Sequence, residues 1–87
     1  MAAPHNVEWL VVMQPIKVDT GGDDRDGRLV MANGRLVALL VRLEDEDHEH
    51  AGGWFLEASF GKLPSRSAPI FDTLDDATRW LRQRLKS

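Results

Sequence analysis

The chain has 87 residues, of which 43% are hydrophobic and 29% charged, and its formal net charge is −3. This length predicts one domain covering residues 1–87, because a chain of this size supports a single, thin hydrophobic core. The lack of cysteine excludes disulfides, thiolate nucleophiles and Cys-based zinc sites, and it fits a cytoplasmic location. The sequence has no apolar run near the ~18 residues that span a bilayer, so we expect no membrane partner.

The N-terminal part of the chain predicts one strand and one connection. Residues 1–6 are expected to be disordered. Residues 7–13 are rich in β-branched and aromatic side chains and precede Pro15, which favours a short strand that Pro15 stops. A weak continuation through residues 16–19 is the alternative. Residues 20–27 are turn-forming and charged, and they predict a flexible connection to the next strand.

The strongest local signal is a hairpin over residues 28–43. Asn33 and Gly34 lie between two apolar runs, and this pair readily takes the positive φ angles of a type I′ turn. A two-residue turn predicts these cross-strand pairs: Ala32 with Arg35, Met31 with Leu36, Val30 with Val37, and Leu29 with Ala38. Both faces of the hairpin are then apolar. One face carries Val30, Val37, Leu39, Val41 and Leu43, and the other carries Leu29, Met31, Leu36, Ala38 and Leu40.

The C-terminal part predicts a further strand and one helix. Residues 53–60 form the strand, with Trp54, Leu56, Ala58 and Phe60 on one side and Phe55, Glu57 and Ser59 on the other. Residues 70–71 add a short edge strand. The helix covers about residues 74–86, with Thr73 as its N-cap. Its apolar stripe consists of Leu74, Ala77, Thr78, Leu81 and Leu85, with Trp80 on the flank. The predicted class is α+β, with an antiparallel sheet of about four strands packed on one C-terminal helix.

One helix covers only one side of a sheet, so the second apolar side predicts an interaction surface. This surface comprises Leu29, Met31, Leu36, Leu40 and Phe55. Three alternatives remain open for what covers it. The sheet curls and is covered by residues 14–27, the chain forms a homodimer through a sheet face or edge, or a small ligand binds there.

An acidic segment is expected to form the loop 44–53. Its side chains from Glu44 to His50 are all ionisable, and Glu46, His48 and His50 would share one face of an extended strand as metal ligands. Continuing the strand would drive Asp45 and Asp47 into the core at a cost of several kcal/mol per charge. A solvated loop is therefore the alternative to a metal site.

A nucleic-acid-binding face is a second candidate, because Arg79, Arg82 and Lys86 lie close together on the predicted helix surface. The order of strand, Gly-Lys turn and helix over residues 54–85 loosely resembles the three-stranded, one-helix DNA-binding domains of phage-type integrases. The resemblance implies DNA binding by a basic, aromatic sheet face. The preceding apolar strands and the acidic loop depart from that pattern, and an Asp75–Arg79 ion pair would leave the helix face merely solvated.

The sequence contains no recognisable catalytic motif. It lacks a Gly-x-Ser-x-Gly elbow, and Leu63 occupies the Ser/Thr position of a phosphate-binding loop after Gly61-Lys62. We therefore expect no catalytic residue and no cofactor. The sequence predicts a non-enzymatic protein-interaction module, with a second copy or an unidentified protein as its partner.

Overall fold

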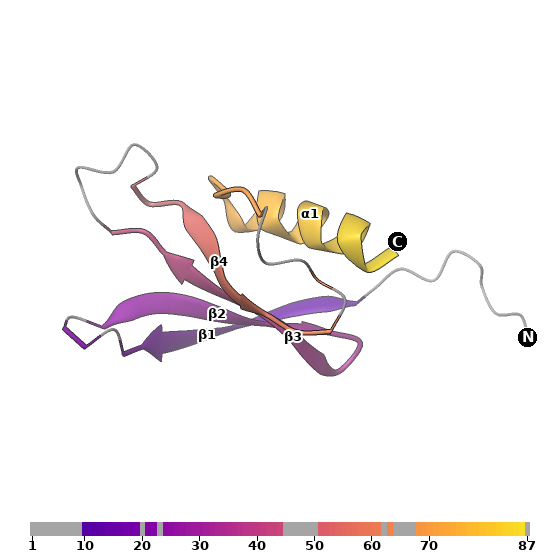
Figure 1. Ribbon diagram of the computed structural model, residues 1–87, viewed down its shortest axis with the longest axis horizontal. Helices are drawn as coiled ribbons and strands as arrows, with labels where there is room; N and C mark the ends of the chain where they lie inside the picture. Colours follow the sequence, from indigo (N-terminus) through magenta and orange to yellow (C-terminus); the bar gives the residue numbers. More distant parts are fainter. Residues whose placement is uncertain are drawn as a thin grey trace, which may run out of the picture.

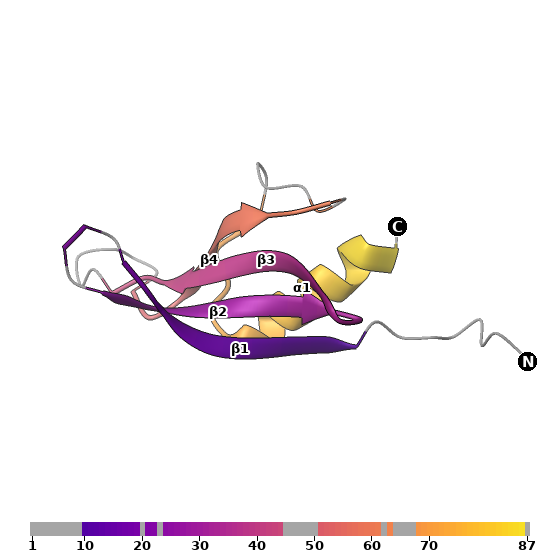
Figure 2. The same cartoon turned by 90° about the horizontal axis from the view of Figure 1, so that it is seen from below.

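The structure is a computed structural model that describes residues 10–19, 21–22, 24–44, 51–61, 63 and 68–86. Within these residues one antiparallel sheet has the strand order β1-β2-β3-β4, and a C-terminal helix follows it. The elements are β1 (Val11–Val18), β2 (Arg25–Ala32), β3 (Arg35–Arg42), β4 (Trp54–Ser59) and α1 (Leu74–Lys86). Figures 1 and 2 show α1 lying across one face of the sheet. The predicted α+β class is therefore confirmed. Residues 1–6, predicted to be disordered, lie outside the described residues.

The first strand follows the alternative in which it continues beyond Pro15, and Pro15 does not stop it. Residues 7–9 lie outside the described residues, and β1 extends to Val18. This is compatible with proline because β1 is an edge strand, where one side of the backbone makes no ladder bonds. The next strand also begins earlier than predicted, at Arg25, so the connection before it is shorter than residues 20–27.

The hairpin turn is confirmed, with φ of 52° at Asn33 and 83° at Gly34. The pairs nearest the turn, Ala32 with Arg35 and Met31 with Leu36, are confirmed as well. The next two predicted pairs are wrong, because a β-bulge shifts the register. Beyond the bulge, Val30 pairs with Ala38 and Leu29 pairs with Leu39. Val37 is therefore the extra residue of β3, with no partner in β2.

The bulge decides which residues of β3 form the core. It turns Ala38 and Leu40 toward α1, and both are 0% exposed. The predicted position of Leu40 on the second, exposed side is therefore wrong. The core cluster beneath the helix consists of Val30, Ala38, Leu40, Trp54, Leu63, Phe71, Ala77 and Leu81.

A second bulge lies in β4, because Leu40 pairs with Leu56 whereas Leu39 pairs with Ala58. Glu57 is the extra residue, and the predicted alternation from Trp54 to Phe60 is broken there. The predicted edge strand at residues 70–71 is a single bridge. Trp54 and Phe71 exchange two backbone hydrogen bonds, of 2.7 and 2.8 Å, at the outer edge of β4.

The helix begins as predicted. Thr73 Oγ1 accepts a hydrogen bond of 3.0 Å from the backbone N–H of Asp76. In the predicted stripe Ala77 and Leu81 are fully buried, and Leu74, Trp80 and Leu85 pack around them. The predicted Asp75–Arg79 pair is replaced by one between Asp76 and Arg79.

Replacing Thr73 with alanine removes this cap and leaves one N–H of the first turn without a side-chain acceptor. We expect Thr73→Ala to lower the free energy of unfolding by about 1 kcal/mol, measured by urea denaturation followed by circular dichroism. Thr73→Ser keeps the hydroxyl and is the matched control. Equal stability of the alanine and serine variants would contradict a capping role.

Candidate interaction surface

The side of the sheet opposite α1 is a continuous apolar surface, which we call the open face. Directly paired residues of neighbouring strands lie on the same side of a sheet, so the register defines this surface. It consists of three cross-strand rows: Val12-Met31-Leu36, Gln14-Leu29-Leu39-Ala58, and Ile16-Gly27-Val41-Phe55. None of these side chains is charged, and Gln14 is the one polar residue among them. No described helix or strand packs on this face, which is turned toward the viewer in Figure 2.

Exposure on the open face decreases away from the Asn33-Gly34 turn. Val12 and Leu36, in the row nearest the turn, are 51% and 40% exposed, whereas Val41 in the third row is only 3% exposed. At that far end the side chains of Ile16 and Val18 lie close over Gly27. Residues 14–18 and 25–27 are strands of the sheet itself, so at this end only the side chains of Ile16 and Val18 reduce the exposure, and the apolar surface near the turn stays accessible.

Four of the five residues predicted for the interaction surface lie on the open face. Leu29, Met31 and Phe55 are partly exposed, and Leu36 is exposed. Leu40 is buried on the other side for the reason given above. Sequence reasoning missed Val12 and Leu39. The alternation of side chains along residues 11–18 could have predicted that Val12 lies on the open face. The side on which Leu39 lies depends on the bulge at Val37.

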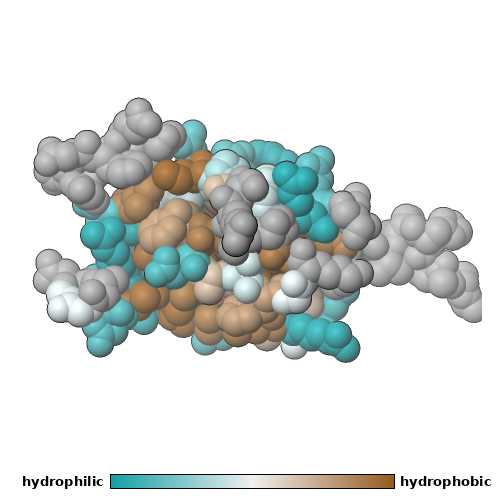
Figure 3. All heavy atoms as spheres, viewed as in Figure 1, coloured by the Kyte–Doolittle hydropathy of each residue, from teal (hydrophilic) through white to brown (hydrophobic). Residues whose placement is uncertain are grey.

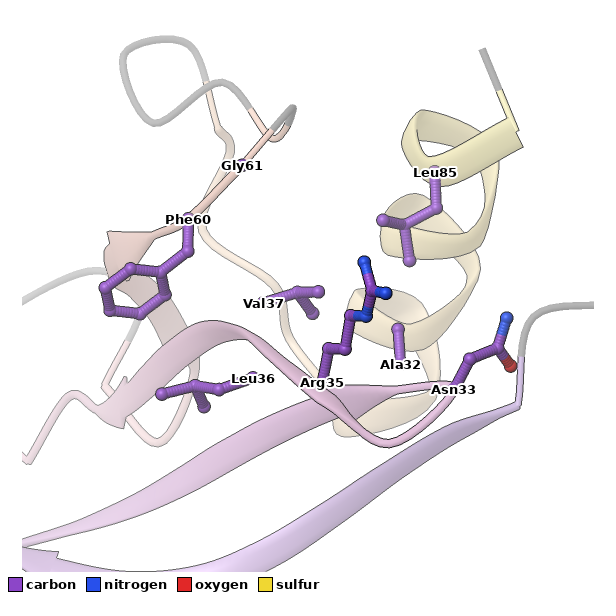
Figure 4. Close-up of a pocket in the computed structure, with 8 residues that line it drawn as sticks. All are labelled: Ala32, Asn33, Arg35, Leu36, Val37, Phe60, Gly61 and Leu85. Atoms are coloured by element: carbon purple, nitrogen blue, oxygen red, sulfur yellow. The ribbon is translucent and has the colours of Figure 1, made fainter.

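A groove with apolar walls lies beside the row of the open face nearest the turn. Figure 3 shows apolar residues gathered over the strands in the centre of the view, with hydrophilic residues toward both ends. A groove of about 480 Å³ opens between the C-terminal part of α1 and the end of β4. In Figure 4, Arg35, Val37 and Leu85 point into this groove and Phe60 lies on its far side. Phe60 is 47% exposed, so the groove adds apolar surface next to Leu36.

A group of charged residues lies on the helix side of the sheet, around Asp26. Asp26 pairs with Lys17 and lies 3.9 Å from Arg42 Nη1. The hydrogen bond from Lys17, and then its charge, lower the pKa of Asp26, and the same contact raises the pKa of Lys17. The guanidinium of Arg28 stacks 4.8 Å from the ring centroid of Trp54. These contacts pair Lys17, Arg42 and Arg28 with Asp26 or Trp54 on the helix side, and the three rows of the open face contain no charged side chain.

The predicted metal ligands Glu46, His48 and His50 lie outside the described residues, as does most of the acidic loop 44–53. Within the part of the chain that the structure describes, no group of three or more His, Asp or Glu side chains could hold a metal ion.

The predicted nucleic-acid face is only partly available as a basic surface. Arg79 is paired with Asp76, and Arg82 is partly buried with its Nε away from any acceptor among the described residues. Arg84 stacks on Trp80, with 4.9 Å from its guanidinium carbon to the ring centroid. Lys86 ends the helix. The sheet face that a DNA-binding domain of the integrase type would use is apolar here.

Comparisons with known proteins found no matching family model, and no match among curated proteins or solved structures. None of the described helices is both long enough and apolar enough to cross a membrane. The structure describes a two-layer α+β domain, in which α1 covers one face of the sheet and the other face is the open face.

Proposed function

We propose that this domain is a non-enzymatic protein-interaction module that self-associates, and that the open face is its binding surface. The observation that carries the proposal is the accessible apolar area near the turn, where Val12 and Leu36 are 51% and 40% exposed. Burying apolar area is the main favourable contribution to protein association, and contiguous exposed apolar surfaces of this kind mark interaction sites.

The remaining surface supports this choice over the alternatives. Three cations of the sheet, Lys17, Arg28 and Arg42, contact Asp26 or Trp54, and Arg79 on the helix is paired with Asp76. A nucleic-acid-binding surface needs several cations free to contact phosphates. An apolar protein surface needs none.

Sedimentation equilibrium over a micromolar to millimolar series tests the proposal. We expect reversible self-association of the natural sequence, and we expect Leu36→Glu to weaken it by more than about tenfold, because the interface would bury unpaired carboxylates. Ala51→Glu adds the same charge at an exposed position outside the open face and is expected to associate normally. A natural protein that stays monomeric throughout, or equal effects of the two variants, would contradict the proposal.

A further inference from the structure

A sheet offers a partner two kinds of surface, its faces and its edge strands. At the outer edge of β4, Trp54 already exchanges two backbone hydrogen bonds with Phe71. That edge is therefore partly occupied by the chain itself. The mode of association depends on whether the other edge, at β1, can accept a partner strand.

Pro15 interrupts the free edge of β1. The N–H of Asn33 donates to the carbonyl of Leu10, which fixes the alternation of inward and outward backbone groups along the strand. Residues an even number of positions from Leu10 direct their backbone groups toward β2, and the others direct them away from the sheet. The outward set is Val11, Met13, Pro15 and Lys17. Because proline has no N–H, the centre of this edge lacks a donor in any pairing that uses most of the strand.

The open face has no such obstacle. Its three rows contain no charged side chain, and two charged residues flank them, Arg25 beside Val18 and Glu57 at the bulge of β4 between Phe55 and Ala58. The rows of an identical face are equally apolar, so stacking the rows of two copies buries no charge from within them. Four strands about 4.8 Å apart and eight residues rising about 3.3 Å each give about 500 Å² per copy. Two copies then reach about 1,000 Å², the lower size limit of a specific interface, which predicts a weak, micromolar dimer.

We propose that the partner of the open face is a second copy of this chain, stacked face to face about a two-fold axis, and that Pro15 keeps the β1 edge from adding further copies. Assembly therefore stops at two. This inference rests on the proposed function and specifies its geometry. A face-to-face pair is closed, whereas edge pairing would continue the sheet from one molecule into the next.

Backbone amide exchange, followed by NMR at low and high protein concentration, distinguishes the two modes. Face-to-face stacking covers side chains and leaves the outward amides of Val11, Met13 and Lys17 in exchange with water. We expect their exchange rates to change less than about twofold with concentration, because they gain no hydrogen-bond acceptor. Protection of these three amides by more than about tenfold on association would overturn the face-to-face arrangement and establish edge pairing. A protein that never associates would instead refute the proposed function.

The role of Pro15 has its own test in the size of the assembly. Pro15→Val restores the missing edge donor, and we expect light scattering to show species larger than a dimer. Lys17→Val is the matched control, because Lys17 lies on the helix side of the same edge strand, its amide already faces outward, and the substitution adds no edge donor. It is expected to stop at two copies. Assemblies of the same size for both variants, or growth of the natural protein beyond two copies, would overturn the role of Pro15.

Discussion

Leu40→Ala is expected to lower the free energy of unfolding by about 2–5 kcal/mol, which is the largest effect of any truncation considered for this domain. Leu40 is 0% exposed and lies in the core cluster with Leu81 of the helix. Removing its side chain leaves a cavity that the surrounding strands and α1 cannot fill. Urea or thermal denaturation at a concentration below the dimer range measures the loss.

Leu39, the residue next to Leu40, provides the control for this loss of stability. Leu39 is partly exposed on the open face, so Leu39→Ala is expected to cost about 1 kcal/mol or less in the monomer. A hairpin without the bulge at Val37 would reverse the two residues. If Leu39→Ala were as destabilising as Leu40→Ala, the observed register and the assignment of the open face would both be wrong.

Gly27→Ala is expected to destabilise the fold by about 1–3 kcal/mol through overpacking. A Cβ on Gly27 would lie 2.6 Å from Val18 Cγ2 and 3.2 Å from the carbonyl oxygen of Leu40, which belongs to the backbone and cannot move aside easily. Ile16 Cγ1 would be 3.3 Å away. Thermal denaturation of the variant beside the natural protein gives the effect.

Two further variants separate this contact from a general effect of replacing glycine. Gly22→Ala is the matched control, because a Cβ there would have no atom within 4 Å, and it is expected to be nearly neutral. Adding Val18→Ala to Gly27→Ala removes the closest clash and is expected to recover part of the loss. A Gly27→Ala protein as stable as Gly22→Ala would show that β1 does not close over β2 at this position.

The helix and the hairpin turn could be predicted because their signals are local. Thr73 caps the helix through a bond to Asp76, only three residues away, and Asn33-Gly34 defines the turn by its own backbone preferences. The existence of a second apolar face could be predicted for the same reason, because the apolar side chains of a single strand alternate between its two faces.

The composition of that face could not be predicted in full. The bulges at Val37 and Glu57 arise from how three strands pair and pack, and neither position carries a residue that demands a bulge. Each bulge changes which side the following residues occupy, so Leu39 and Leu40 exchange their predicted sides. The continuation of β1 through Pro15 also depends on tertiary structure, because only its position at the sheet edge makes proline acceptable there.

The most direct test of the central claim uses the methionine methyl groups. Met31 lies on the open face, whereas Met13 packs against the core on the helix side. In protein labelled with ¹³C at the methionine methyls, we expect the Met31 resonance to shift with protein concentration and to become protected from a soluble paramagnetic agent, while the Met13 resonance stays constant. If the Met31 resonance is unchanged up to millimolar protein and remains open to the agent, the open face does not bind a second copy.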